Sequence, residues 1–234
     1  MFVKNSDRFL FAFNRIDHRL KEIAGAKSFL PFYRLVDQSK KKDAIVRKYE
    51  DDLRAFADLR NAIVHHRTAL DYVIAEPHDE IVDRIEQLDI TLSRPTHVGK
   101  MFRKRVRVFQ IQDSLHKVLK TIHNRQYTQF PIYEGKQFRG LLTTVGITNW
   151  FANRINHGKL SHKMPTIGDI LEFEKRRVNY KFISRYMTVY EAEELFKQGV
   201  ESGKRFEALL ITEHGKKEQK LIGMITPLDI MKIE

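Results

Sequence analysis

The strongest constraint on the fold is an internal repeat that fills the chain after residue 95. The first copy predicts a strand, a helix, two strands and a helix over 106–109, 113–124, 130–133, 140–143 and 144–153. The second copy predicts the same series over 180–183, 188–199, 206–212, 221–226 and 227–233. A repeated unit of this kind folds as one supersecondary structure that packs on its copy. We therefore expect two β-α-β-β-α repeats, one after the other.

Short fragments fix how the two copies align. VGKM at 98–101 matches IGDI at 167–170, and GLLT at 140–143 matches GMIT at 223–226. The second copy is longer, mainly through the charged segment 213–220.

The residues before the repeat have helical periodicity instead. They predict a first helix that Asn5 or Ser6 caps and that runs to residue 24, and further helices over 29–36, 44–66 and 77–92. Gly25 ends the first helix, and Pro95 ends the helical region. The predicted fold class is thus α+β. A four-helix bundle-like domain at 1–95 precedes repeats at 96–165 and 166–234.

Charge divides the chain at the same point. Residues 1–95 hold 17 Lys+Arg and 16 Asp+Glu, whereas residues 96–234 hold 25 and 14. The basic half should attract anions such as a nucleotide, a polyphosphate or nucleic acid, unless it is only a solvated surface.

Composition excludes several classes of function. The chain has no cysteine, which excludes disulfides, thiol catalysis and Cys-ligated zinc and fits a cytoplasmic protein. Its histidines lack the spacing of a metal site. No apolar run is long enough to span a bilayer, so we expect no membrane partner.

The fragment GMITPLD at 223–229 offers the most groups that could bind a ligand. Thr226 suits a helix N-cap, Pro227 the first helical position and Asp229 the third. Free N–H groups at such a helix start attract phosphate, and the Asp229 carboxylate can accept hydrogen bonds from ribose hydroxyls. The alternative is a capping box that only stabilises the helix.

Together with IGDI at 167–170 and TVYEA at 188–192, this fragment resembles the CBS (cystathionine β-synthase-type) domain family. Two such repeats form a Bateman module, which typically binds AMP, ATP, S-adenosylmethionine or a related adenine compound. The resemblance implies that Thr226 and Asp229 contact phosphate and ribose. It also implies that the strand containing Tyr180, Lys181 and Phe182 lines the adenine pocket.

The first repeat departs from this pattern. Thr143 matches Thr226, but Gly146 stands where the family has a carboxylate, so the site on Thr143 is empty or takes a different ligand. Arg107 and Lys181 occupy equivalent strand positions. They either neutralise phosphate in the clefts or face solvent.

A second candidate site ends the long N-terminal helix. Arg60, Asn61 and His65 fall within an arc of about 140° on its polar side. Arg can hold a phosphate and His can act as acid or base near neutral pH. The Arg-Asn-x-x-x-His spacing resembles the HEPN superfamily. Many of its members are metal-independent ribonucleases whose Arg and His meet across a dimer interface. The alternative is an ordinary polar helix face.

These features favour a cytoplasmic regulatory protein, a homodimer with no required cofactor, in which an adenine nucleotide binds the repeats and controls the helical domain. One alternative adds RNA cleavage by Arg60 and His65, with Asn61 in support. Another is a basic nucleic-acid-binding or scaffold protein, which would bind with steep salt dependence.

Overall fold

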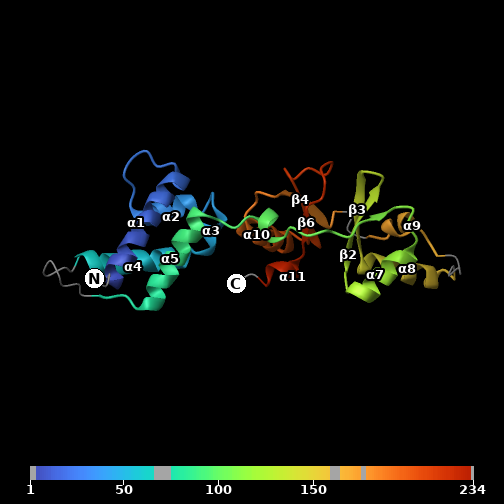
Figure 1. Ribbon diagram of the computed structural model, residues 1–234, viewed down its shortest axis with the longest axis horizontal. Coiled ribbons are helices and arrows are strands. Elements are labelled where there is room, and N and C mark those ends of the chain that lie inside the picture. The colour runs from blue at the N-terminus through green and yellow to red at the C-terminus, as the bar shows by residue number, and fades with distance from the viewer. Residues whose placement is uncertain (1–3, 66–74, 159–163, 175–177, 233–234) are drawn as a thin grey trace. The chain divides into compact units, whose positions relative to one another are not determined.

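The structure is a computed structural model that describes residues 4–65, 75–158, 164–174 and 178–232 (Figure 1). The chain divides into two compact units, residues 1–96 and 97–234. The first is helical, and the second contains both repeats, so the predicted α+β fold class is confirmed.

The helical unit is built around α1 (Asn5–Ala24), which packs against α2 (Phe32–Ser39), α4 (Glu50–His65) and α5 (Asp79–Ser93). Its buried positions recur at helical spacing and include Phe9, Phe13, Ile16 and Leu20. Gly25 ends α1 with φ 72°, in the left-handed region that favours glycine.

The start of α1 differs from the prediction, because neither Asn5 nor Ser6 caps the helix with its side chain. The N-cap is Lys4, and the Ser6 N–H donates to Glu76 Oε1 at 2.9 Å. The Asn5 amide instead donates to Asp79 Oδ1 at 2.7 Å. Glu76, shortly before α5, therefore satisfies one N–H of this helix end, and Asp79 at the start of α5 holds the Asn5 side chain.

The single helix predicted over 44–66 is wrong. It is divided into α3 (Ala44–Lys48) and α4, with Tyr49 between them at φ −106° and ψ 24°. The Asp43 carboxylate fixes the start of α3 by accepting from two N–H groups. Residues 44–46 are all buried, so α3 lies in the core of the helical unit.

Each repeat contains a three-stranded sheet with its middle strand parallel to one neighbour and antiparallel to the other. The first repeat comprises α6 (Val98–Met101), β1 (Phe109–Gln110), α7 (Leu115–Arg125), β2 (Gln129–Glu134), β3 (Gln137–Thr143) and α8 (Thr144–Asn156). The second comprises α9 (Ile167–Leu171), β4 (Tyr180–Ser184), α10 (Val189–Glu201), β5 (Ala208–Thr212), β6 (Gly223–Ile225) and α11 (Pro227–Ile230).

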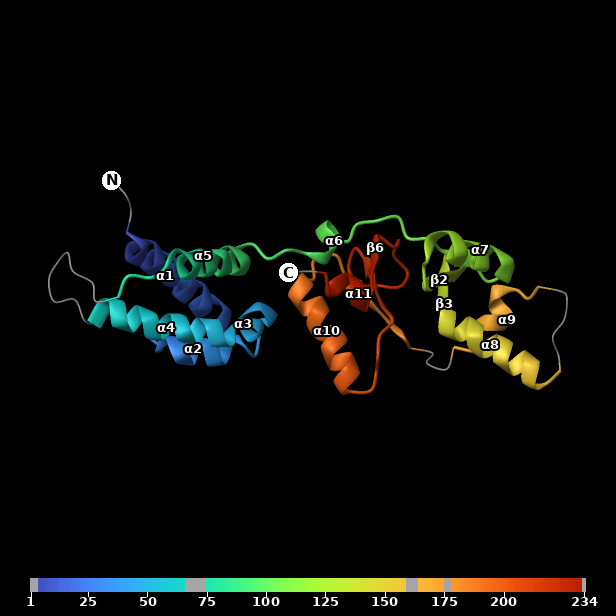
Figure 2. The ribbon, with the colours of Figure 1, turned by 90° about the horizontal axis from the view of Figure 1, so that it is seen from below.

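The short helices α6 and α9 are exchanged between the repeats. Val98 of α6 is buried in the core of the second repeat, whereas Ile167 and Ile170 of α9 are buried in the core of the first. In Figure 2, α6 accordingly lies with β6, α10 and α11, and α9 lies beside α8.

Matching hydrogen bonds hold the two exchanged helices. The N–H of Val98 donates to Met187 O, and that of Ile167 donates to Asp113 O, both at 2.9 Å. The exchange ties the repeats together, so neither core is complete without a segment from the other.

An apolar cluster joins the two sheets directly. Leu141, Ala208 and Leu210 are buried in it. The Phe138 ring contacts Tyr180 and Phe182 edge-on, with centroids 4.9 and 5.0 Å away.

Candidate functional site

The Thr226–Asp229 pair lies where β6 ends and α11 begins. The backbone N–H and the hydroxyl of Thr226 both donate to Asp229 Oδ2 at 2.8 Å. These bonds occupy one carboxylate oxygen, and Oδ1 takes part in neither of them. The bond from the Thr226 N–H is also one of the two bonds of a capping box, so it does not by itself distinguish a ligand site from a helix cap.

Two other capping boxes in the same unit provide a comparison. Asp169 accepts from Thr166, and Glu191 accepts from Thr188, through the same pair of donors, but both carboxylates belong to exposed residues. The Asp229 side chain is only 28% exposed, and its Oδ1 lies 3.5 Å from Lys104 Nζ.

Charge balance at Asp229 favours the ionised form. Burial alone would raise the pKa of this carboxyl, but hydrogen bonds from Thr226 and the nearby Lys104 ammonium hold the pKa below its ordinary value. Asp229 is therefore a carboxylate near neutral pH, with one oxygen able to accept from hydroxyl groups.

Strand pairing shows where β4, the strand predicted to line the adenine pocket, lies relative to Thr226. Tyr180 pairs with Ala208 in β5, and Leu209 pairs with Ile225 in β6. Tyr180 and Thr226 therefore lie at the same end of the sheet, on either side of β5. The rings of Tyr180 and Phe182 pack on Phe138, whereas Lys181 is exposed.

In the first repeat, Thr143 is bound by a carboxylate that the sequence analysis did not single out. Glu174, beyond α9, approaches Thr143 from 31 positions further along the chain. Its Oε1 accepts from the Thr143 N–H at 2.5 Å and from the Thr143 hydroxyl at 2.9 Å. These are the two donors that Thr226 offers to Asp229.

Gly146 makes room for Glu174. A Cβ on residue 146 would collide with Glu174 Oε1, so any side chain there would displace the carboxylate. The missing carboxylate of the first repeat is thus replaced by one from another segment. The glycine was a visible signal of a close approach, but nothing local indicated which residue approached.

Glu174 closes the first-repeat site. The residue is 8% exposed, and its Oε2 accepts from the Asn179 amide at 3.3 Å. Burial raises the pKa of this carboxyl, while the hydrogen bonds from Thr143 act in the opposite direction. Thr143 itself is 5% exposed, so neither group is presented to a ligand.

Among the described residues, Arg107 makes no hydrogen bond or ion pair with either threonine–carboxylate pair. It is exposed in the extended segment before β1, with its guanidinium carbon 5.5 Å from the centre of the Phe109 ring. Hydrogen bonds from Lys117 and the Gln110 N–H lower the pKa of Asp113, and the charge of Arg107 adds to this effect.

The second predicted site lies at the end of α4. Arg60 Nη1 donates to Asn61 Oδ1 at 3.3 Å, so these two side chains are together, Asn61 exposed and Arg60 partly buried. His65 is the last residue of α4, and its side chain lies outside the described part of the structure.

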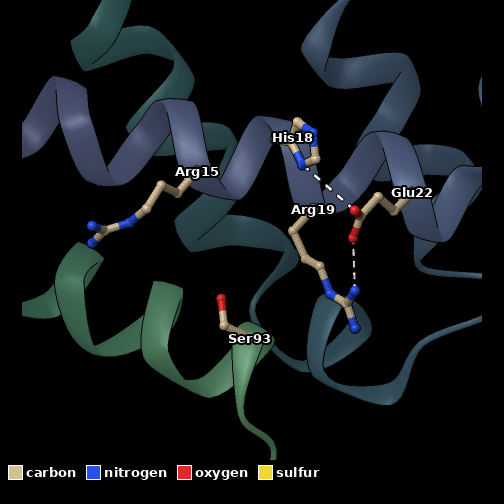
Figure 3. Close-up of a pocket in the computed structure, with 5 residues that line it drawn as sticks. All are labelled: Arg15, His18, Arg19, Glu22 and Ser93. Carbon is tan, nitrogen blue, oxygen red and sulfur yellow. Dashed lines mark hydrogen bonds and ion pairs between the residues drawn. The ribbon is translucent and has the colours of Figure 1, made fainter.

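The helical unit also has a small hollow of about 300 Å³ between α1 and α5 (Figure 3). There His18 and Arg19 converge on Glu22, with Arg19 Nη1 2.7 Å from Glu22 Oε2. These side chains are 42–76% exposed, and ion pairs at such exposure contribute little. We assign no ligand to this hollow.

The described ranges hold neither a metal cluster nor a membrane span. No group of His, Asp and Glu there is arranged to hold a metal ion. None of the helices described is both long and apolar enough to cross a bilayer.

No protein-family model matches this sequence, and no curated protein matches it. The solved structures that match include CBS-domain proteins. One is CBSX2 in complex with AMP, at 16% identity and TM-score 0.43, covering 58% of this chain and 94% of that one.

Two more structures match to a similar degree. The CBS-domain pair of protein MJ0100, in complex with 5′-methylthioadenosine and S-adenosylmethionine, has 15% identity and TM-score 0.42, covering 59% and 95% of the two chains. A CBS-domain-containing protein from Kribbella flavida has 10% identity and TM-score 0.43, covering 59% and 97%. Since these TM-scores lie below 0.5, the function is argued from the chain's own residues.

Proposed function

We propose that the chain is a regulatory protein whose second repeat binds an adenine nucleotide at Thr226 and Asp229. The observation that carries the proposal is the partly buried Asp229 carboxylate, whose Oδ1 takes no part in the hydrogen bonds from Thr226. The two ribose hydroxyls would donate to that oxygen.

Lys104 completes the site. It pairs with Asp229 at 3.5 Å, and its side chain is 48% exposed. Because the side chain is not buried, it is free to reorient toward a phosphate. The base would lie toward Tyr180, at the same end of the sheet as Thr226. The resemblance of GMITPLD to the CBS motif supports adenine as this base.

The first repeat contributes no second site of this kind. Thr143 and its acceptor Glu174 are both buried, and displacing that carboxylate would leave a buried N–H without a partner. We therefore expect one nucleotide per chain.

Control of the helical unit belongs to the same proposal. The nucleotide would bind one conformational state of the homodimer more tightly than another. It can shift the equilibrium between the two states only by as much as its affinities for them differ. This part is tested by the change in dimer dissociation constant on adding the nucleotide.

The direct test is calorimetric titration of the full chain with AMP, ADP, ATP, S-adenosylmethionine and cyclic di-AMP. We expect one of these to bind with a stoichiometry of one and to raise the melting temperature by mass action. Asp229→Ala should abolish binding.

Asp169→Ala is the matched control, because it removes the same kind of Thr-x-x-Asp capping box from an exposed position. It should leave binding unchanged. Equal losses in both variants, or no binding of any adenine compound, would refute the proposed site.

A second candidate function is metal-independent RNA cleavage by the helical unit. The hydrogen bond between Arg60 and Asn61 supports it, since it holds a guanidinium and an amide side by side at the end of α4. Arg60→Ala and His65→Ala should abolish cleavage of an RNA substrate, whereas Arg34→Ala, at an exposed site on α2, should not. Purified protein that cuts no RNA, with or without nucleotide, would exclude this function.

A further inference from the structure

A large basic groove lies within the second unit, and its lining includes none of the residues of the two threonine–carboxylate pairs. Its volume is about 1220 Å³. Its walls are the extended segment before β1, the turn between β2 and β3 with Gly135, and the connection between β5 and β6. Thr226 lies beyond the opposite end of β6 from that connection.

The charge of the groove is strongly unbalanced. Six cationic side chains line it, against Glu213 and Glu218. The six are Arg103, Lys104, Arg105, Lys136, Arg185 and Lys220.

Most of these cations lack a counter-ion among the described residues. Arg185 pairs with Glu213 at 3.1 Å, and Lys104 pairs with Asp229. Within the described chain, the other four form no ion pair. Like charges gathered in one concave surface repel one another, and an anion with several charges relieves that repulsion.

We infer that this groove binds a linear oligophosphate, either free or carried by a nucleoside. Guanidinium groups bind a phosphate through two parallel hydrogen bonds, and ammonium groups add point charges that can pair with further phosphates of the oligophosphate. A single phosphate would meet only part of the lining, so affinity rises with the number of phosphates.

The groove also has a link to the proposed nucleotide site. Lys104 lines the groove and is the lining residue that contacts Asp229. An oligophosphate that attracts Lys104 would weaken its pair with Asp229 and so alter the nucleotide affinity.

The test is calorimetric titration of the full chain with tripolyphosphate, orthophosphate and ATP at low salt, where exposed charges are least screened. We expect tripolyphosphate to bind at least about ten-fold more tightly than orthophosphate. Arg105→Glu/Lys136→Glu should weaken tripolyphosphate binding by about ten-fold or more.

Lys120→Glu/Arg125→Glu is the matched control, since it makes the same charge change at exposed positions on α7. It should change the affinity by less than about two-fold. Lys136→Gln/Lys220→Gln is a milder groove variant in case the charge reversal prevents folding, and it should also weaken binding.

Asp229→Ala separates this site from the proposed nucleotide site, because tripolyphosphate should still bind that variant. ATP binding that survives Asp229→Ala and is lost in the groove variant would identify a nucleoside-borne oligophosphate. If tripolyphosphate binds at the groove and ATP does not, the ligand is a free oligophosphate and not one carried by a nucleoside.

Equal tripolyphosphate affinity in the groove variant and the wild type would overturn the inference, as would no binding at all. So would an RNA oligonucleotide that binds where tripolyphosphate does not, because the groove would then serve nucleic acid.

Discussion

In both repeats a threonine donates the same pair of hydrogen bonds to a carboxylate, but the carboxylate comes from a different part of the chain. In the second repeat the acceptor is Asp229, three residues from Thr226; in the first it is Glu174, 31 residues from Thr143. The local carboxylate stays partly exposed, whereas the distant one is buried together with its threonine. The same hydrogen bonding can thus leave a site open or close it, depending on which segment supplies the carboxylate.

The largest effect should come from placing the carboxylate of the second repeat in the first. Gly146→Asp puts a side chain where Glu174 Oε1 lies, because even the new Cβ would collide with that oxygen. Overpacking and the approach of two buried carboxylates should reduce the free energy of unfolding by about 3 kcal/mol. Urea denaturation measures this, and a loss close to zero would contradict the tight fit.

Removing the distant carboxylate should have the next largest effect. Glu174→Ala leaves the Thr143 N–H and hydroxyl without their acceptor in a buried position, at a cost of about 2 kcal/mol by urea denaturation. When Gly146→Asp and Glu174→Ala are combined, the introduced aspartate can replace the lost acceptor.

That double variant should be more stable than either single variant and bind two nucleotides per chain. A stoichiometry that remains at one would contradict the view that Glu174 alone closes the first site.

Removing the local carboxylate should cost less. Asp229→Ala deletes a helix cap that is partly exposed, and the free energy of unfolding should fall by about 1 kcal/mol. Urea denaturation of this variant beside Glu174→Ala tests the order. If Asp229→Ala is the more destabilising of the two, the contrast between an exposed cap and a buried acceptor does not hold.

The smallest effect is a difference in pH dependence. Burial raises the pKa of Glu174, so its contribution to stability is fully present below the unfolded pKa and is lost as pH rises through the folded value. The pKa of Asp229 is lowered, so its contribution is present above the unfolded pKa and is lost as pH falls through the folded value.

Glu174→Gln removes the first of these dependences. The stability of this variant relative to the wild type should therefore increase as pH rises from about 4 to about 7. Thermal unfolding across this range measures the trend for Glu174→Gln. Asp229→Asn should show the opposite trend, and only as pH falls below about 4, where Asp229 of the wild type becomes protonated. A parallel trend in both variants would contradict the assignment.

Local patterns predicted most of the fold. The two series of strands and helices, the helix end at Gly25 and the Thr226–Asp229 pair all depend on residues a few positions apart. The break at Tyr49 was missed because the helical pattern continues through it and no glycine or proline marks it in the sequence.

The sequence by itself determined the repeat, its strand order and the capped helix start at Thr226, because each is set by neighbours along the chain. Only the tertiary structure decided that α6 and α9 exchange cores and that Glu174 reaches Thr143. Gly146 allowed that approach but could not specify it. The partner depends on the path of the chain through space, and residues brought together by that path need share no local pattern.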